Sequence, residues 1–519
     1  MKTELNSSKN QLHTISEMAA RIAELEAIVR YYEEQFRLVQ HQRFGASSEK
    51  GMASGQLCLF DEVENTADAE EPELELPQIV CMRRKQKGKR ADDLSGLSEE
   101  TVPHDLSESE RICPECGEAL HGIGHNVRQE LVIIPARVKV VKHEQAVYAC
   151  RNCEKNNDHV PIVKAAMPEP VIKGSLASPS AVAHILTQKY VMCSPLYRQE
   201  QDWKRQGVAL SRQTMANWVI RCAEDWLTPL YERMKRRLLA HALLHADETV
   251  VQVLKEPEKT PQSKSTMWLY RTSGDTEEHI VLFEYQPSRK AEHPRVFLDG
   301  FSGYLHTDGY AGYHTLSEVT VVGCWVHMRR KFEAVVKSTL SSPDASAQEA
   351  IRRIGVLFHL EGQWEKLTPE ERFERRLRES KPLAESFFSW LESLSVIPKS
   401  TMGIAIGYAL DQRPWLMNIY LDGRTELSNN RVENAVRPFA VGRKNWLFCD
   451  TVKGAQASAV VYSVIETAKA NGLKPFEYLE FLLESLPNTT TGGLDDLLPW
   501  GGVIPQRCRM PVKGDARSA

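Results

Sequence analysis

The stretch that decides the fold of the central part of the chain is LLHADETVVQVL at residues 243–254. It is rich in leucine and valine, and it contains neither glycine nor proline. Such runs are typical of buried β-strands. Aspartate is depleted in strands, so Asp247 within this run is hard to explain as a purely structural residue.

Four further strand-like runs follow this stretch and indicate a sheet. Helical patterns separate the later runs, and this alternation predicts an α/β domain with a mixed sheet, which we place at residues 241–470. Residues 333–425 have Leu, Phe and Trp at helical spacing, and we interpret them as an all-helical insertion. The four runs are WLYRT (268–272), HIVLFEY (279–285), GYLHTDGY (303–310) and VTVVGCW (319–325).

Three carboxylates in this region are candidates for chemistry: Asp247, Asp308 and Glu433. Two aspartates at strand ends and one helical glutamate can converge at one sheet edge, where their oxygens suit Mg²⁺ or Mn²⁺. Two such ions can support in-line phosphoryl transfer, which predicts a metal-dependent nuclease or transferase. Structural alternatives are a simple turn at Asp308-Gly309 and a capping box between Asn430 and Glu433.

Two Cys-x-x-Cys pairs predict a zinc-binding ribbon at residues 105–160. The pairs are Cys113/Cys116 and Cys150/Cys153, and they flank a segment rich in valine and isoleucine. Four thiolates close a tetrahedral site and leave no position for water, so one Zn²⁺ would be structural. The alternative is two independent redox or incidental pairs.

Residues 170–240 are expected to form a helical module. Ser178-Pro179 is typical of an N-cap followed by a first-turn proline. A second helix is predicted over 195–205, Gly207 marks a turn, and Ser211 is placed to cap a third helix.

The third helix, RQTMANWVIRC, offers Arg212, Gln213 and Asn217 on its polar side. These side-chain types read base edges, and the arrangement resembles a helix-turn-helix. A plain helical spacer fits the same pattern.

The N-terminal region is expected to combine a coiled coil at 10–45 with a charged linker at 46–104. A coiled coil predicts a homodimer or a higher oligomer; the alternative is an amphipathic surface helix. The basic run RRKQKGKR at 83–90 is a solvated tether or a phosphate contact. Heptad position a holds Ile15, Ile22, Val29 and Phe36, and position d holds Met18, Leu25, Tyr32 and Val39.

Composition sets the broad class of the protein. A length of 519 residues allows about three or four domains. The formal net charge of −4 does not exclude a nucleic-acid partner, because charge can segregate along the chain. No run of 18 apolar residues and no secretory signal is present, so we expect a cytoplasmic protein with no membrane partner.

Several long motifs resemble one family in the same order. HADET, LHTDGYAGY, GCWVHMRRKF and NNRVENAVRPFAVGRKNWLF are similar to segments of the large transposase of the bacterial insertion sequence 66 family. The resemblance implies a DDE transposase with a multidomain α+β architecture and a ribonuclease-H-like catalytic fold. It also implies that Asp247, Asp308 and Glu433 hold two Mg²⁺ ions, and none of the motifs departs from the family pattern.

The resemblance further implies DNA as partner, both the terminal repeats of the element and target DNA, together with accessory proteins of the same element. Cys324-x-x-His327 resembles a motif found after the second Asp in several transposase groups. In this chain the resemblance implies that His327 contacts DNA or orders the fold near the active site. The alternative is that Cys324 is a packed cysteine and His327 a buried histidine. Three basic residues follow Glu433 and have two interpretations: they hold phosphates, or they are ordinary surface charges. They are Arg437, Arg443 and Lys444.

Two other functions remain open on the residues alone: a metal-dependent nuclease that does not join DNA, and a DNA-binding regulator derived from a transposase. Residues 471–519 are expected to be a C-terminal tail.

Overall fold

The computed structural model describes residues 101, 118, 137–150, 162–338, 344–489 and 493–511. The described residues up to 166 form one compact unit together with 509–511, and residues 167–508 form a second. In the first unit, β1 (Val147–Ala149) and β2 (Ile162–Lys164) pair antiparallel. The predicted coiled coil, the linker apart from residue 101, and Cys113, Cys116 and Cys153 lie outside the described residues.

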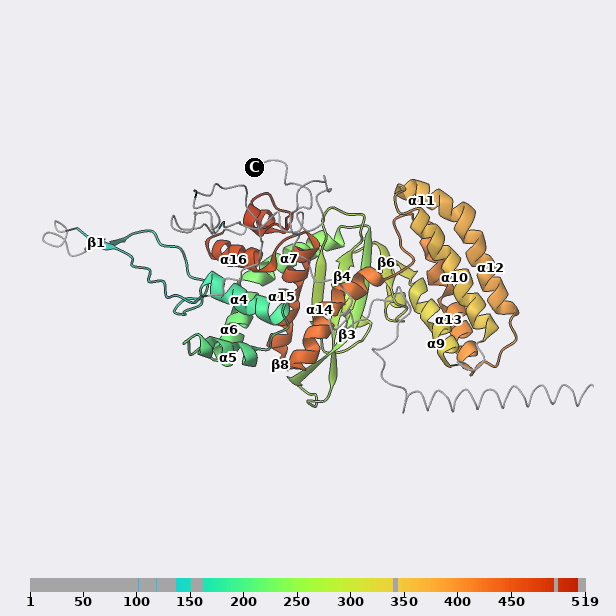
Figure 1. Ribbon diagram of the computed structural model, residues 1–519, viewed down its shortest axis with the longest axis horizontal. Helices are drawn as coiled ribbons and strands as arrows, with labels where there is room; N and C mark the ends of the chain where they lie inside the picture. The colour runs from blue at the N-terminus through green and yellow to red at the C-terminus, as the bar shows by residue number, and fades with distance from the viewer. Residues whose placement is uncertain are drawn as a thin grey trace, which may run out of the picture. The chain divides into compact units, whose positions relative to one another are not determined.

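The second unit is built on a six-stranded mixed sheet in the order β5-β4-β3-β6-β7, with β8 paired to β3 (Figure 1). β4 is antiparallel to β3 and to β5, whereas β6 is parallel to β3 and to β7. All five strand-like runs of the sequence contribute to this sheet, so the predicted mixed sheet is confirmed. The strands are β3 (Leu243–Lys255), β4 (Lys264–Thr272), β5 (Val281–Gln286), β6 (Gly303–Thr307), β7 (Val319–Gly323) and β8 (Cys449–Thr451).

The register of β3 against β6 decides where the two aspartates emerge. The pairing ends with His245 opposite His306, while β3 continues along β4. Asp247 follows His245 by two residues and Asp308 follows His306 by two residues, so both lie just beyond the same end of this parallel pair. The expectation that Asp247 ends a strand is wrong, because it is the fifth of the 13 residues of β3.

The helices predicted over 178–222 are confirmed. The Ser178 hydroxyl caps the first helix with Pro179 behind it, and the Ser211 hydroxyl caps the third. Gly207 has a φ of +83°, a left-handed conformation that suits the turn between the second and third helices. The helices are α4 (Pro179–Tyr190), α5 (Leu196–Arg205), α6 (Arg212–Cys222), the π-helical turn η3 (Ala223–Leu227) and α7 (Thr228–Leu239).

Helix α15 (Val452–Ala470) covers the outer edge of the sheet. The hydroxyls of Ser463 and Thr467 accept hydrogen bonds from the backbone N–H groups of Phe283 at 2.8 Å and Val281 at 3.0 Å. These contacts satisfy the donors of edge strand β5, which would otherwise be a template for aggregation. Helix α16 (Pro475–Ser485) packs on α4, so the expected C-terminal tail includes a helix that the sequence reading missed.

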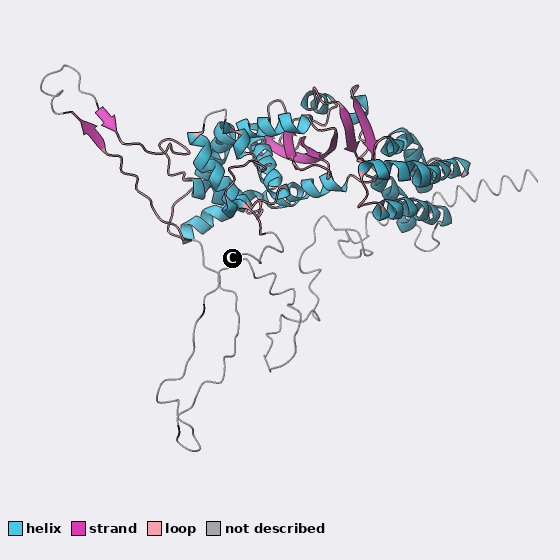
Figure 2. Cartoon of the chain, turned by 90° about the horizontal axis from the view of Figure 1, so that it is seen from above, coloured by secondary structure: helices cyan, strands magenta, loops and turns pink. Residues whose placement is uncertain are grey.

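The residues between β7 and α14 (Asn430–Trp446) are largely helical (Figure 2). Their buried apolar side chains form a second core cluster, which also includes Val322 of β7. The first helix begins at Trp325, earlier than the expected residue 333. A short helix, α8 (Glu292–Phe297), precedes β6. The helices are α9 (Trp325–Ser338), α10 (Ala345–Gln363), α11 (Pro369–Arg375), the π-helical η5 (Arg376–Ser380), α12 (Lys381–Ser393) and α13 (Thr401–Leu416).

One buried charge ties this helical region to the chain segment that leads into α14. Arg376 is 1% exposed and pairs with both Glu361 oxygens at 2.7 Å. It also donates to the carbonyls of Asp422 and Thr425.

Within the described residues, none of the helices has both the length and the apolar character that crossing a bilayer requires.

Candidate active site

Asp247 and Asp308 lie at the end of the β3–β6 pair. Each uses one carboxylate oxygen locally: Asp247 Oδ1 accepts from the Glu248 N–H at 2.8 Å, and Asp308 Oδ1 accepts from the Tyr310 N–H at 3.0 Å. Gly309 has a φ of +97°, so the turn proposed as an alternative is present. That turn points the Asp308 carboxylate back toward its own loop, and it does not exclude a second role for the other oxygen.

The carboxylate of Asp247 is surrounded by like charges. Burial raises its pKa well above the usual value, and the negative charges of Glu248, Asp308 and, to a smaller extent, Glu433 raise it further. Gathering acids in a low-dielectric site costs free energy unless a cation or a proton compensates. These carboxylate oxygens are the hard ligands that Mg²⁺ prefers, so their chemistry fits this ion. Among the described residues, however, oxygens of Asp247, Asp308 and Glu433 do not all come within 4.8 Å of one another.

Glu248, which the sequence reading did not single out, has partners of its own. It accepts from Arg289 Nε at 2.7 Å and from the Tyr313 hydroxyl at 2.9 Å. Burial and Asp308 raise its pKa, while Arg289 lowers it. Glu248 therefore adds negative charge beside Asp247 but is already held by protein donors.

Glu433 lies in the first turn of α14, and its carboxylate faces α9. Arg330 Nη2 donates to its Oε2 at 2.9 Å, and His327 Nδ1 lies 3.7 Å from its Oε1. The alternative capping box is wrong, because α14 begins at Asn430 and its N-cap residue Asn429 makes no side-chain capping bond.

A pair of histidines joins the two strands behind the aspartates. His245 and His306 are fully buried and stacked, with ring centroids 5.1 Å apart. Burial lowers the pKa of each to about 3, so both are neutral. Each histidine stands two residues before an aspartate, and this repeated H-x-D pattern is the sequence signal that could have revealed the pair.

Asn429 connects the N-terminus of α14 to β3 and to the start of α9. Its Oδ1 accepts from His245 Nδ1 at 2.9 Å, and its Nδ2 donates to the Ala246 carbonyl at 2.9 Å. Its backbone N–H donates to Cys324 Sγ at 3.2 Å. The helix that carries Glu433 is thus anchored to the residue directly before Asp247.

Comparison with known protein families matches this part of the chain. The sequence model described as transposase IS66 family covers residues 174–457, which include all three candidate carboxylates. The chain belongs to this family.

Three further sequence models of the same family match other parts of this transposase. The zinc-finger binding domain of transposase IS66 matches residues 110–154, and the IS66 C-terminal element matches residues 463–500. A model described as transposase C of IS166 homeodomain matches residues 31–102. A zinc-finger domain and transposase domains indicate DNA as a partner, the use of metal and a structural zinc.

The chain is similar to several uncharacterized proteins of Sinorhizobium fredii (strain NBRC 101917 / NGR234). Protein y4jD is 31% identical over 407 residues, covering 75% of this chain and 78% of the relative. Protein y4qI is 28% identical over 515 residues, covering 93% of this chain and 92% of the relative.

The structure places the predicted DNA-contacting residues of the transposase in two separate groups. Arg212, Gln213 and Asn217 are exposed on α6. The Arg212 guanidinium lies 5.8 Å from the Tyr197 ring centroid, and its backbone N–H is bound by Glu200. These side chains are accessible to a ligand.

The second group lies around Glu433. His327 of α9 contacts Glu433. Arg437 lies one helical turn after Glu433, on the same face of α14. Among the described residues no acceptor binds the buried Nε of Arg437. Arg443 differs, since it bonds to Thr249 and Val250 of β3 and so supports the sheet.

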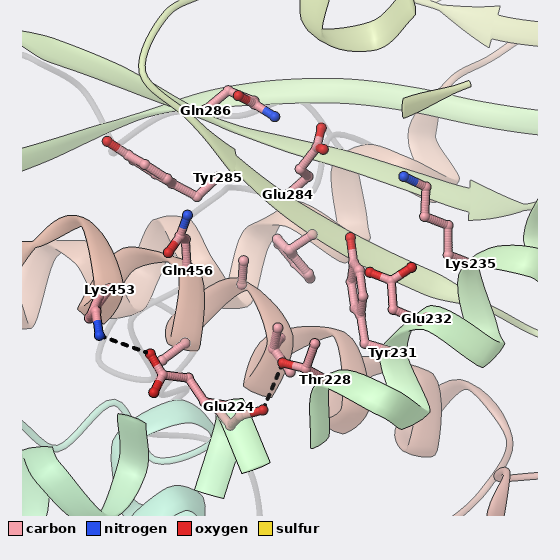
Figure 3. Close-up of a pocket in the computed structure, with 15 residues that line it drawn as sticks. Glu224, Thr228, Tyr231, Glu232, Lys235, Glu284, Tyr285, Gln286, Lys453 and Gln456 are labelled. Atoms are coloured by element: carbon pink, nitrogen blue, oxygen red, sulfur yellow. Dashed lines mark hydrogen bonds and ion pairs between the residues drawn. The ribbon is translucent and has the colours of Figure 1, made fainter. Parts of the chain in front are cut away.

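A separate cavity of about 340 Å³ lies between α7, β5 and α15 (Figure 3). Glu284, Glu232 and Lys235 are among its lining residues, and Lys453 pairs with Glu224 at its rim at 3.8 Å. None of the candidate carboxylates lines it.

Of the predicted zinc ligands, only Cys150 is described; it is exposed and directly follows β1.

Proposed function

We propose that this transposase cleaves the ends of its insertion sequence and joins the freed 3′-hydroxyl to target DNA. Asp247, Asp308 and Glu433 are the proposed ligands of two Mg²⁺ or Mn²⁺ ions. The observation that carries this proposal is the gathering of like-charged carboxylates around buried Asp247, beyond the end of the β3–β6 pair. Such a set is costly without cations and suited to them.

The strand order supports a ribonuclease-H-like catalytic domain at residues 241–470 with the helical insertion at 333–425. Three antiparallel strands, β5, β4 and β3, are followed by β6 and β7, both parallel to β3. In this arrangement the insertion falls between the second aspartate and the glutamate.

The chemistry requires two successive attacks on phosphorus. Water first attacks the phosphodiester at the end of the element and releases a 3′-hydroxyl; that hydroxyl then attacks a phosphodiester of target DNA and expels one of its oxygens. When bound, the two ions supply Lewis acidity to the attacking and leaving oxygens. The buried Nε of Arg437 has no acceptor among the described residues, which supports a role for Arg437 in binding a phosphate near Glu433.

Recognition of the terminal repeats is proposed to lie outside the catalytic domain. The zinc ribbon, with Zn²⁺ held by Cys113, Cys116, Cys150 and Cys153, and the module at 170–240 would bind the element ends. The exposure of Arg212, Gln213 and Asn217 on α6 supports base contacts there. The coiled coil would pair two ends in a homodimer or higher oligomer, and accessory proteins of the element would assist.

The test is to incubate the full chain with DNA that carries the element ends and a target plasmid, with and without Mg²⁺, and to score cleavage and joining separately. We expect both, each dependent on Mg²⁺. Cleavage without joining identifies a nuclease. Specific binding without cleavage identifies a transposase-derived regulator.

A further inference from the structure

Three possible metal ligands lie close together at the start of α9 and α14: the sulfur of Cys324, an imidazole nitrogen of His327 and a carboxylate oxygen of Glu433. One ligand atom from each of the three lies within 4.8 Å of the other two. Cys324 directly precedes α9, His327 follows one turn later, and Glu433 comes from α14. Helix geometry therefore puts the first two side chains on the same side, toward the glutamate.

We infer that these three residues form a second, inhibitory metal site for a thiophilic divalent cation, Zn²⁺. The inhibitory part rests on the proposed function, because it requires Glu433 to be a ligand at the catalytic site. The metal site itself does not depend on that function.

The distances are close to those of a tetrahedral zinc site, whose ligand atoms lie about 3 to 4 Å from one another. His327 Nδ1 and Glu433 Oε1 are 3.7 Å apart and need no movement. His327 Nδ1 is buried and makes no hydrogen bond to a described residue, so no protein group competes with an ion for this nitrogen. Only the sulfur has to approach by a small side-chain adjustment.

Backbone donors surround Cys324 Sγ, while burial raises the pKa of this thiol to about 11, so a bound ion has to displace its proton. The backbone N–H groups of Asn429, His327 and Val326 point at this sulfur, and the Asn429 donor lies 3.2 Å away. Hydrogen bonds of this kind orient a metal-bound sulfur and stabilise its negative charge.

The ligand types select zinc over magnesium. Thiolate and imidazole are borderline or soft ligands, which Zn²⁺ accepts and Mg²⁺ does not. Three protein ligands leave a fourth position open to water. The proposed site at Asp247 and Asp308 offers only oxygens, so the two sites prefer different ions.

Arg330 opposes the ion at this site. It donates to Glu433 Oε2 at 2.9 Å, and its Nη1 lies 3.4 Å from His327 Nε2, so its positive charge faces two of the three ligands. Removal of this charge should strengthen zinc binding. If Cys324 and His327 have only a structural role, removal of the Arg330 charge should not strengthen zinc binding.

Sharing Glu433 makes the two sites compete. A zinc ion held by Cys324 and His327 would keep the Glu433 carboxylate on the α9 side, away from the aspartates. Zn²⁺ should therefore inhibit cleavage that Mg²⁺ supports, and excess Mg²⁺ should not displace it from the sulfur.

The first experiment measures zinc binding to the full chain by equilibrium dialysis and elemental analysis. We expect the wild-type chain to bind one more zinc ion than Cys324→Ser or His327→Gln. Each substitution should weaken this ion by more than about 100-fold, the upper range for loss of a mere supporting partner. Arg330→Gln should tighten it. Matched controls are Cys222→Ser, another buried cysteine, and His359→Gln, an exposed histidine, neither of which should change the count.

The second experiment measures the ratio of cleavage rates with and without Zn²⁺ at fixed Mg²⁺, each variant against itself. Cys324→Ser and His327→Gln should raise the half-inhibitory zinc concentration by more than about 100-fold, in line with the expected loss of zinc affinity. Equal zinc counts in the wild type and both variants would overturn the site, whatever the activity. If the protein cleaves no DNA, the proposed function fails while the zinc count still decides the site.

Discussion

Two regions of the unit formed by residues 167–508 each bury a carboxylate whose pKa is raised, but for different reasons. At Asp247, burial is reinforced by the charges of Glu248, Asp308 and Glu433. At Glu284, in the cavity between α7, β5 and α15, burial raises the pKa to about 7, and Lys235 lowers it. Several acids gather around Asp247, although Glu248 pairs with Arg289 and Glu433 pairs with Arg330. Glu284 has one acid, Glu232, and one base, Lys235, beside it.

The difference shows what marks a metal site. Burial alone makes an acid hold its proton, and that requires no ligand. An accumulation of acids around a buried carboxylate instead favours a bound cation, because protonating one acid leaves the others charged. We therefore propose the metal site at the end of the β3–β6 pair and not at the cavity beside Glu284.

The largest expected effect separates the two regions by activity. Asp247→Asn, Asp308→Asn and Glu433→Gln should each lower the cleavage rate by at least about 1,000-fold, because ligands of one metal cluster act as a unit. Glu284→Gln should leave the rate within about twofold. Single-turnover cleavage of labelled end DNA measures both, and DNA binding by gel shift is the control for folding. A near-normal rate for any carboxylate variant removes that residue from the site.

The next effect separates the two regions by the pH dependence of stability. The folded protein keeps the Glu284 proton up to about pH 7, whereas the unfolded chain loses it near the ordinary pKa of 4.5. The free energy of unfolding therefore falls as pH rises from 4.5 to 7, by up to about 3 kcal/mol from this group.

Glu284→Gln should accordingly be more stable than the wild type at pH 8 by up to about 3 kcal/mol and similar to it at pH 4.5. Chemical unfolding at both pH values is the measurement. A difference that is equal at the two values would mean that burial of the charge is not its cause.

A smaller expected effect, on stability and on Mg²⁺ dependence, tests whether Asn429 anchors the helix that carries Glu433. The cavity region has no such anchor. Asn429→Ala removes the partners of His245 Nδ1 and of the Ala246 carbonyl. Leaving a buried polar group unpaired costs about 1–3 kcal/mol. We expect lower stability of this size and a higher Mg²⁺ concentration for half-maximal cleavage.

The control for this prediction is Asn418→Ala. Asn418 also donates to a backbone carbonyl, that of Val321 at 2.8 Å, but it has no contact with the carboxylates. It should lose stability without a change in Mg²⁺ dependence. The same Mg²⁺ dependence in both variants would contradict a positioning role for Asn429.

The smallest effect is stabilisation by the ion itself. A ligand that binds only the folded state at 100 times its dissociation constant adds about 2.7 kcal/mol. Millimolar Mg²⁺ should raise the melting temperature of the wild type and of Glu284→Gln by a few degrees, and that of Asp247→Asn by much less. An equal rise in all three proteins would place the bound Mg²⁺ elsewhere.

The sequence by itself determined five of the six strands and the position of Asp308 directly after a strand. Strand-forming runs around Asp247 and Asp308 define their own elements, because alternating burial and β-branched residues act locally. The caps at Ser178 and Ser211 could also be read directly, since an N-cap involves residues only three apart.

Only the tertiary structure decided the surroundings of Glu433. Its partner Arg330 is 103 residues away, and the contact between His245 and Asn429 spans 184 residues. No local pattern distinguished the capping box predicted with Asn430 from the ion pair that forms instead. Contacts across such separations depend on how helices α9 and α14 pack beside the sheet, and that packing follows from the combined burial of many side chains rather than from any one motif.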